Sequence, residues 1–529
     1  MNYRILGNET EAARALAEKA EARLLESLGK ARAIECDSIG FAVMREGGTA
    51  AAVWSDFRLE ESALKYLEEN GSALGEGETY VSTVSLGKYL RERGDRILSE
   101  KWRALEGYIG KPITDELKEL YKLYTDEIVV WMAKLYDPKI GGWYWSNSAR
   151  DTEGFLPSIE ETYEAMMFIK SSGMAGMFDN DWSRAIPDWL KKKIGDFVYN
   201  LQDEDGFFYH PQWPKEYIIE NNRQSRITRD VGSAKTLLRG LGIKPKYPDP
   251  GKRSEEKRGE KEKPAMLTQY ESAENFAAYI KGFDDEISAI EDPYKRAFKF
   301  YYYGNLFQST TGYVNKNPEF KKILLDFFKK WQNPKNGLWS DVLCYDATNG
   351  LHKIASVYNS IGARLEHVDE MVASTMEMIS VDPKTKPAGA GTYVYNAWSC
   401  FPYIYYNIRH FAEGSEAERE AACQKIKDTV LRTAPKTISY SREHIKGLRR
   451  EDGSFSYSRS GSCPTAQGCP IAVPGACEGD MNGNSIATLA LIQHIMRALE
   501  AEEYEIPLFT EAERVKFMDI LEELNAQTK

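Results

Sequence analysis

The sequence predicts an all-helical protein that folds as an (α/α)6 toroid, a double-layered ring of helix pairs, with an N-terminal helical extension. Two observations predict this class. A short turn that joins glycine to an aromatic residue recurs along the chain, and helices with one charged face alternate with helices that are apolar nearly all round. Because the apolar helices need burial on both sides, we expect them to form an inner ring.

The repeated turn places Asp, Asn or Pro before a glycine and an aromatic residue. The clear copies read YDPKIGGWYW (136–145), LQDEDGFFYH (201–210), WQNPKNGLWS (331–340) and LRREDGSFSY (448–457), and SVDPKTKPAGAGTYVYNAW (380–398) is a looser copy. The gap between Gly206 and Gly337 is about twice the others, so one copy lacks the turn, and helical stretches within 266–307 fill its place. Six helix pairs result.

The expected ring accounts for residues 131–500, and the other parts are assigned around it. Residues 1–130 are predicted to form further helices packed on the ring, with a separate helical domain as the alternative. A helical tail is expected over 501–529. The segment 246–264 is almost entirely charged residues and turn formers, which predicts a solvated loop and leaves open whether it is a lid.

Composition argues against two kinds of partner. Acidic residues outnumber basic ones by 80 to 69, and a net charge of -11 argues against nucleic acid, whose binding needs concentrated positive charge. The N-terminal residues lack a basic segment followed by an apolar core, and no stretch approaches the length of an apolar membrane span. We therefore expect a cytoplasmic protein with no membrane partner, and the oligomeric state stays open.

Three cysteines lie close together in one loop. Cys463, Cys469 and Cys477 have the spacing C-x5-C-x7-C, which differs from the close pairs typical of zinc sites, although Asp480 is near. Free thiols are the favoured interpretation and a zinc site is the alternative. The sequence thus predicts neither a metal nor a cofactor.

The turns, with Gln202 and Trp213 around one copy and Trp331-Gln332 opening another, resemble the repeats of the α/α-toroid superfamily over about residues 130–500. That superfamily includes terpenoid cyclases, protein prenyltransferase β subunits and many glycan-cleaving enzymes. The resemblance implies a ring and leaves the reaction open. The acidic segments DEDG (203–206), DND (179–181) and FDDEIS (283–288) do not match the Asp-rich motifs that terpenoid cyclases use, which weakens that chemistry.

Loops that share one phase of the repeat open at the same end of a ring, so their polar residues are expected to converge. These loops are rich in Trp, Tyr, Asn, Arg and carboxylates, which suits a polyhydroxylated ligand because each buried hydroxyl needs a hydrogen-bond partner. The predicted substrate-binding residues are Trp143, Trp145, Asn147, Arg150, Tyr209, Gln212, Trp213, Arg226, Arg229, Trp339, Asn349, Asn396, Trp398 and Asn482.

Two reactions fit such a pocket. Hydrolysis of a glycosidic bond needs a protonated carboxyl and a second carboxylate, whereas elimination beside a uronate carboxyl needs a His or Tyr base and a cation or amide. The predicted catalytic residues are Asp151, His210, Asp230, Asp341, His352 and Asp480. Each has a structural alternative: a turn for His210, the core for His352, an ion pair for Asp230 and a helix cap for Asp480.

We therefore predict a carbohydrate-active enzyme that cleaves a glycosidic bond in an oligosaccharide. A hydrolase is slightly favoured over a uronate lyase, because carboxylates outnumber histidines at the expected mouth of the pocket. An isoprenoid cyclase or prenyltransferase-like enzyme is one alternative, and a non-catalytic glycan-binding protein is the other.

Overall fold

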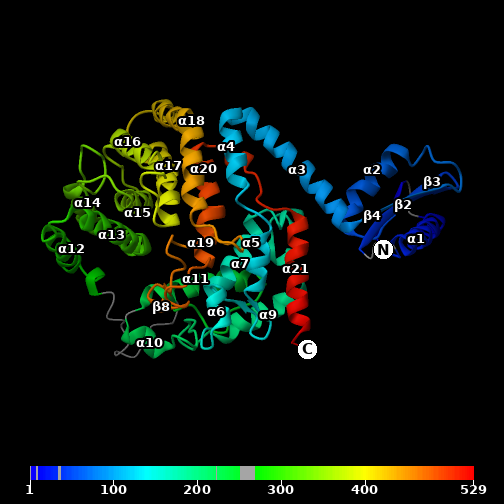
Figure 1. Ribbon diagram of the computed structural model, residues 1–529, viewed down its shortest axis with the longest axis horizontal. Coiled ribbons are helices and arrows are strands. Elements are labelled where there is room, and N and C mark those ends of the chain that lie inside the picture. Colours follow the sequence, from blue (N-terminus) through cyan, green and yellow to red (C-terminus); the bar gives the residue numbers. More distant parts are fainter. Residues whose placement is uncertain (1, 7–9, 34–36, 222, 251–267, 529) are drawn as a thin grey trace. The chain divides into compact units, whose positions relative to one another are not determined.

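A computed structural model describes the chain except residues 1, 7–9, 34–36, 222, 251–267 and 529 (Figure 1). The chain divides into two compact units, Met1–Ser99 and Glu100–Lys529, which are described separately. The protein is mostly helical, as predicted. In the described part of the chain, no helix combines the length and apolar character needed to cross a bilayer. Most of the predicted loop 246–264 lies outside the described residues.

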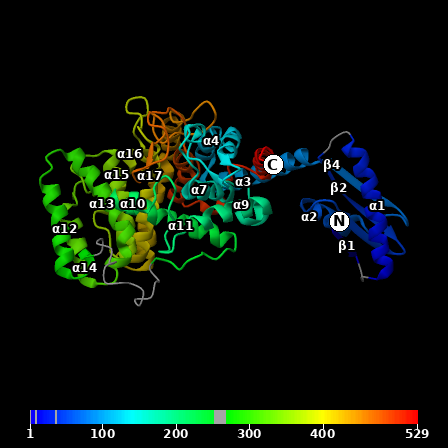
Figure 2. The same ribbon diagram turned by 90° about the horizontal axis from the view of Figure 1, so that it is seen from below.

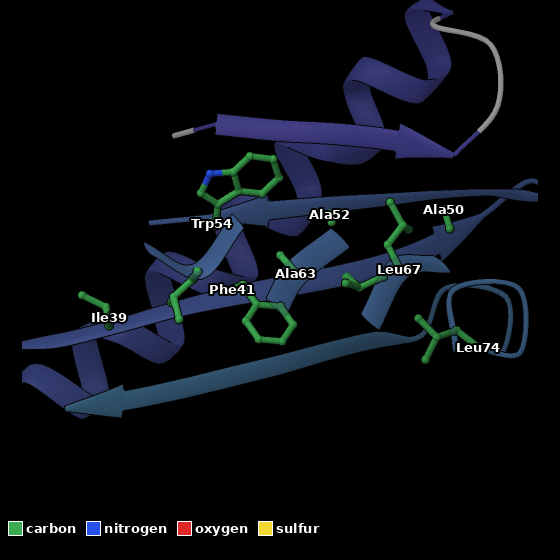
Figure 3. Packing of buried hydrophobic residues seen from close by; sticks show 10 residues of the cluster. Ile39, Phe41, Ala50, Ala52, Trp54, Ala63, Leu67 and Leu74 are labelled. Carbon is green, nitrogen blue, oxygen red and sulfur yellow. The ribbon is translucent and has the colours of Figure 1, made fainter. Parts of the chain in front are cut away.

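The first unit contains an antiparallel sheet of four strands in the order β1-β3-β2-β4. Its elements are β1 (Asn2–Leu6), α1 (Glu11–Arg32), β2 (Ser38–Glu46), β3 (Thr49–Trp54), α2 (Glu60–Asn70) and β4 (Thr79–Ser85). Alternate residues of β2 and β3 point to opposite faces. Phe41 and Trp54 pack with α2 on one face (Figure 3), while Ala42 and Val53 pack with α1 on the other.

The prediction of helices alone over 1–130 is therefore wrong. The segments at 11–32 and 86–109 are helical, but four strands lie among them. Strands β2 and β3 are buried on both faces, so their sequences are almost continuously apolar and carry no polar alternation. Gly47 and Gly48, both with positive φ, form the tight turn between them, and this Gly-Gly pair was the available hairpin signal.

The second unit contains helices of two kinds. One series, called the buried helices because α7, α15 and α17 are extensively buried, consists of α7 (Ile159–Ser171), α11 (Gln224–Gly240), α13 (Pro293–Val314), α15 (Tyr345–Ile361), α17 (Gly391–Phe411) and the run α19 (Met481–Ser485), η5 (Ile486–Ala490) and α20 (Leu491–Ala498), in which η5 is π-helical. The amphipathic ones are α5 (Glu127–Lys134), α9 (Asp188–Asn200), α12 (Ala273–Ser288), α14 (Pro318–Trp331), α16 (Val368–Ile379) and α18 (Glu416–Lys446).

The buried helices pack on one another in series. Helix α11 packs on α7 and α7 on α19, while α20 packs on α17, α17 on α15 and α15 on α13. Figure 2 shows α13, α15 and α17 side by side. The remaining helices of this unit include α3 (Leu86–Ile109), which contains the boundary, α4 (Lys111–Tyr121), α6 (Asn147–Asp151), α8 (Trp182–Ala185), α10 (Lys215–Glu220) and α21 (Glu511–Ala526). Helix α4 packs on α18, and α21 packs on α5.

The repeated turn has one geometry in its four clear copies. A glycine adopts a left-handed conformation, and the aromatic residue two positions later is buried. The pairs are Gly141 and Trp143, Gly206 and Phe208, Gly337 and Trp339, and Gly453 and Phe455. The predicted repeat is thus confirmed at these copies, although Gly141 rather than Gly142 takes the left-handed position.

Three of the four clear turns pack closely on an amphipathic helix of another pair, whereas the Gly206 turn lies against residues 248–250. A Cβ on Gly141 would lie 2.7 Å from the Lys193 carbonyl oxygen of α9, and one on Gly337 would lie 2.6 Å from the Met371 nitrogen of α16. A Cβ on Gly453 would lie 2.4 Å from the Cβ of Glu127, which begins α5. The last turn therefore packs on the helix that precedes the first turn.

The Gly337→Ala substitution is expected to lower the free energy of unfolding by more than about 2 kcal/mol, because it adds a backbone clash to the cost of a left-handed alanine. Gly242→Ala is the matched control: its φ of +70° is close to the +71° of Gly337, but nothing lies within 4 Å of an added Cβ. Urea denaturation of both variants measures the difference. Equal losses would show that the close packing of the Gly337 turn contributes little to stability.

Candidate functional site

The loops that precede the buried helices contact one another, as predicted. The Met481 N–H donates to the Trp145 carbonyl oxygen at 3.0 Å, and the Ser148 N–H donates to Glu478 Oε2 at 2.8 Å. His210 Nε2 lies 2.8 Å from the Pro157 carbonyl oxygen. These contacts join the loop that follows the Gly141 turn to the loops that follow the Gly453 and Gly206 turns.

The remaining loops join the same group. The rings of Tyr345 and Tyr393 stack with centroids 4.8 Å apart, which joins the start of α15 to the start of α17. The Gly391 N–H donates to the Tyr457 carbonyl oxygen at 3.0 Å, which joins the start of α17 to the loop that follows the Gly453 turn. The polar residues of five loops therefore lie at one end of the buried helices.

A buried ion cluster connects α7 and α11 at this end. Arg226 is fully buried and donates to both carboxylate oxygens of Asp230, at 3.1 and 2.6 Å, and to Glu160 Oε2 at 2.5 Å. Its guanidinium also lies over the ring of Trp213 at 5.2 Å. Arg229, three residues after Arg226 on α11, is exposed and donates to Glu160 Oε1.

This cluster changes the interpretation of Asp230. Burial raises its pKa to about 6, while the Arg226 charge and hydrogen bonds act in the opposite direction. Both of its oxygens accept hydrogen bonds from Arg226, so the geometry gives Asp230 the role of orienting that arginine. Arg226 in turn holds Glu160, which the sequence prediction did not include.

Two carboxyl groups lie one turn apart on α7 in different environments. Glu160 is held by two arginines, whereas Glu164 lines a cavity of about 150 Å³ with Met132, Met167 and Met481. Burial raises the pKa of Glu164 to about 7, and the nearby Glu160 charge adds to this effect. Ser485, beside the π-helical segment, forms a hydrogen bond with Glu164 that acts in the opposite direction. Such π-helical segments are frequent at functional sites.

A third acid on α7 has no hydrogen-bond partner. Glu161 is fully buried, and neither of its carboxylate oxygens forms a hydrogen bond among the described residues. Burial raises its pKa well above the ordinary value, while the Arg226 charge acts against this shift. Its neutral form is therefore favoured in the folded protein.

The Glu161→Gln variant tests this state through the pH dependence of stability. A carboxyl whose pKa is raised on folding contributes most at low pH, and that contribution is lost as pH rises through the raised pKa. We expect Glu161→Gln to reduce the fall in melting temperature between about pH 5 and about pH 8. The exposed Glu119→Gln control should leave the profile unchanged, and identical profiles for both variants would contradict the prediction.

Further polar side chains from several helices lie near Arg229. Burial raises the pKa values of Glu164, Tyr301 and Tyr395, and the positive charge of Arg229 acts against each of these shifts. The same charge adds to the lowering of the pKa of Lys353. Burial is the largest cause of the lowered pKa of Lys353, which is about 8. These groups come from α7, α11, α13, α15 and α17, so five helices place polar groups within the electrostatic reach of Arg229. Arg229 was predicted from the sequence, whereas the others lie within helices, for which loop composition gave no signal.

His210 serves the loop and not proton transfer. Its Nε2 lies 2.8 Å from the Pro157 carbonyl oxygen, and its Nδ1 accepts from the Gln212 N–H at 3.2 Å. The ring stacks on Trp213 at 3.9 Å, and burial lowers its pKa to about 4. With both ring nitrogens engaged by the main chain, the predicted role as a base is not supported.

His352 is a buried residue of α15 next to the polar interior. Its Nδ1 lies 2.5 Å from Ser399 Oγ, and that hydroxyl donates to the Asn396 carbonyl oxygen at 2.6 Å. The imidazole Nδ1 therefore carries the proton in this arrangement. Burial lowers its pKa well below the usual value, and its ring meets Tyr403 edge-on at 5.2 Å. His352 is neutral and stays a candidate for contact with a ligand.

The other predicted catalytic acids have structural partners. Asp480 is fully buried, and its side chain accepts from the N–H groups of Gly483 at 2.7 Å and Tyr457 at 2.8 Å, so it caps α19. Burial raises its pKa to about 7. Asp151 pairs with its neighbour Arg150 at 2.7 Å, and Asp341 pairs with Arg296 at 2.8 Å, both at exposed positions. These contacts do not support catalytic roles for the three acids.

Several predicted binding residues are part of the core. Trp143, Trp339 and Trp398 are buried, and their indole N–H groups donate to Met132 O, Phe328 O and Ser441 Oγ. They were predicted to bind substrate, but their burial gives them a packing role. The repeat explains this, because its aromatic position fills the space between neighbouring helices.

The remaining predicted binding residues hold loops together or line the interior. Asn147 donates to Asp452 and Tyr209 to Asp205, each at 2.9 Å, while Gln212 accepts from the Leu156 N–H at 2.8 Å. Asn396 donates to Asn349 at 2.9 Å, and its own Oδ1 is buried without a partner among the described residues. Trp145 is buried, and its indole N–H also lacks a partner there. Asn482 is half-buried in α19.

The three clustered cysteines are free thiols. Cys469 is buried, Cys463 is half-buried with its Sγ 3.0 Å from the Thr465 carbonyl oxygen, and Cys477 is exposed. Across the described ranges, no group of three or more His, Cys, Asp and Glu side chains is arranged to hold a metal ion.

In comparisons with known proteins, no protein-family model, no curated protein and no solved structure matches this chain.

Proposed function

We propose that residues 131–500 form an (α/α)6 toroid whose interior holds the catalytic site of a carbohydrate-active enzyme, one that hydrolyses a glycosidic bond in an oligosaccharide. The order of the contacts supports the ring. The turns at Gly141 and Gly337 pack on the helix of the following pair, and the last turn packs on α5 of the first pair. The buried helices contact their neighbours in the series α11, α7 and α19, which continues into α20, and then α17, α15 and α13.

The observation that carries the function is the pair Glu160 and Glu164 on one face of α7. Residues four apart on a helix are neighbours, with about 5–6 Å between their Cβ atoms. Glu160 accepts hydrogen bonds from Arg226 and Arg229, while burial raises the pKa of Glu164 to about 7. Glycoside hydrolysis needs one carboxyl that donates a proton and a second that supplies negative charge, and the different partners of these two side chains fit those roles.

In this mechanism Glu164 is the general acid. At neutral pH a large fraction of it carries a proton, which it donates to the oxygen of the leaving sugar as the glycosidic bond breaks. Glu160 supplies the negative charge that the cationic sugar ring needs, either directly or through a water molecule. The separation of the two carboxyl groups in the substrate complex decides which of these applies.

The groups near Arg229 fit a polar ligand, whereas the cavity that Glu164 lines is also bordered by apolar side chains, among them Met132, Met167 and Phe168. Tyr301, Lys353 and Tyr395 lie within the electrostatic reach of Arg229, and each is only half-buried. Hydroxyl, ammonium and guanidinium groups satisfy sugar hydroxyls, whose burial without partners costs about 1–3 kcal/mol each. An isoprenoid pocket would instead need apolar aromatic walls.

Elimination is the second candidate, and the two cations favour it. Arg229 and Lys353 lie close enough for the Arg229 charge to lower the pKa of Lys353, and the one bond that Lys353 forms among the described residues is to Gln308 Oε1 at 3.1 Å. Arg229 would neutralise a uronate carboxylate bound beside it, which makes the adjacent C–H more acidic. Lys353, whose pKa burial lowers to about 8, would in its unprotonated form take up the proton of that C–H.

A screen of neutral and uronate-containing oligosaccharides tests the proposal. Hydrolysis predicts new reducing ends without ultraviolet absorbance of an unsaturated uronate, whereas elimination produces both signals. Binding without product would favour a non-catalytic glycan-binding protein. Turnover of prenyl diphosphates with no activity on any sugar would favour the isoprenoid class and contradict the proposal.

A further inference from the structure

We propose that the cavity between α15, α17 and α20 is a second binding site, which takes a small polyol bearing a carboxylate, such as a uronic acid. This site is separate from the cavity that Glu164 lines, and it does not depend on glycosidic cleavage. The cavity has a volume of about 360 Å³, which lies within the range of small-molecule sites. Its walls come from three helices that pack on one another (Figure 1).

Polar groups of the wall lack partners in the protein. Within the described part of the chain, the Arg497 guanidinium forms no ion pair or hydrogen bond with another side chain, and His494 Nδ1 is buried without a partner. The hydroxyl groups of Tyr403 and Tyr406 form no hydrogen bond there either. A wall with several unused donors and acceptors suits a ligand with several hydroxyls, because each new bond replaces one to water.

The wall is held in place from behind. Asn359 Nδ2 donates to the Tyr403 carbonyl oxygen at 3.0 Å, and Asn359 Oδ1 accepts from Asn407 Nδ2 at 2.7 Å. The ring of Tyr406 stacks on His410 with centroids 4.0 Å apart. Tyr403 is therefore fixed on its helix before any ligand binds, which reduces the ordering cost of binding.

The charge of the wall selects an anion. Arg497 is a charged residue lining the cavity, and no Asp or Glu is among the described residues that line it. Burial and the Arg497 charge keep the pKa of His494 low, at about 4, so His494 is a neutral hydrogen-bonding group at pH 7. The Arg497 charge acts on the pKa of Glu505, but that carboxylate does not line the cavity and forms no ion pair with Arg497 among the described residues. The Arg497 guanidinium can therefore bind a ligand carboxylate, and the tyrosine rings offer faces to the C–H groups of a sugar.

Calorimetric titration of the full chain with glucuronate at neutral pH tests this site, with glucose as the uncharged comparison. We expect saturable binding of glucuronate and at least about tenfold weaker binding of glucose, since a hydrogen-bonded charge pair is lost. Arg497→Met should weaken glucuronate binding by about tenfold to a hundredfold. Arg432→Met, which changes an exposed arginine of α18, should leave the affinity unchanged.

The outcomes separate this site from the proposed catalytic one. Glu164→Gln should bind glucuronate with native affinity, because Glu164 lines the other cavity. The proposal is overturned if native protein shows no glucuronate binding, or if Arg497→Met binds it as well as the native chain does. Equal binding of glucose and glucuronate would equally overturn the assignment of an anion. Melting temperatures of the variants confirm that each is folded.

Discussion

Replacing Glu164 by Gln is expected to lower turnover of the cleaved oligosaccharide by about 10²- to 10⁴-fold, the range that a general acid contributes. The amide keeps the shape of the side chain and its contact with Ser485, but it has no acidic proton to donate. Binding of the substrate should change much less. Steady-state kinetics therefore should show a fall in kcat with a nearly constant KM.

The pH profile gives an independent check of the same residue. Because Glu164 acts in its protonated form and its pKa is about 7, activity of the native enzyme should fall as pH rises through that value. Glu119→Gln, on the exposed face of α4, is the control and should keep native turnover and profile. Full activity of folded Glu164→Gln would exclude this residue as the acid.

Replacing Arg226 by Met is expected to destabilise the protein by about 3–5 kcal/mol, the largest stability effect that we anticipate. The substitution leaves the buried carboxylate of Asp230 without its cation and leaves Glu160 with Arg229 alone. Removing one partner of a buried ion pair costs more than the pair contributes, because the remaining charge stays desolvated. The midpoint of urea unfolding measures the loss.

Arg229→Met is the matched control for Arg226→Met. Arg229 also bonds to Glu160, but 56% of its side chain is exposed, whereas the Arg226 side chain is fully buried. Solvent screens an exposed charge, so we expect a loss below about 1 kcal/mol. Similar losses in the two variants would show that burial does not decide the strength of this cluster.

The repeat could be predicted because its requirements are local. A left-handed turn favours glycine, and the space beneath the turn needs a large ring. The pairs Gly337 with Trp339 and Gly453 with Phe455 can therefore be recognised in the sequence itself. The strands β2 and β3 were not predicted, since burial on both faces removes the alternation that identifies a strand.

The sequence predicted which loops contact one another, whereas the catalytic and binding roles that it suggested for their residues stay predictions. Polar loop residues converge as expected, yet His210 and Asp480 use their side chains to bond the main chain of those loops, because buried turns leave N–H and C=O groups that need partners. The acid pair lies inside a helix instead. Its available signal was the run of acids in IEETYEAMMFI, since Glu160 and Glu164 share one face of an otherwise apolar helix.

The packing of the Gly453 turn on Glu127 has a consequence for synthesis on the ribosome. Arg449 also bonds to Glu127 at 2.6 Å, and the Tyr124 hydroxyl donates to the Ala487 carbonyl oxygen at 2.8 Å. Helix α5, near the start of this unit, thus waits for partners that are made much later in the chain, and such distant contacts slow folding. Until then its apolar face is open to chaperones, and nascent chains stalled before residue 449 should be sensitive to protease there.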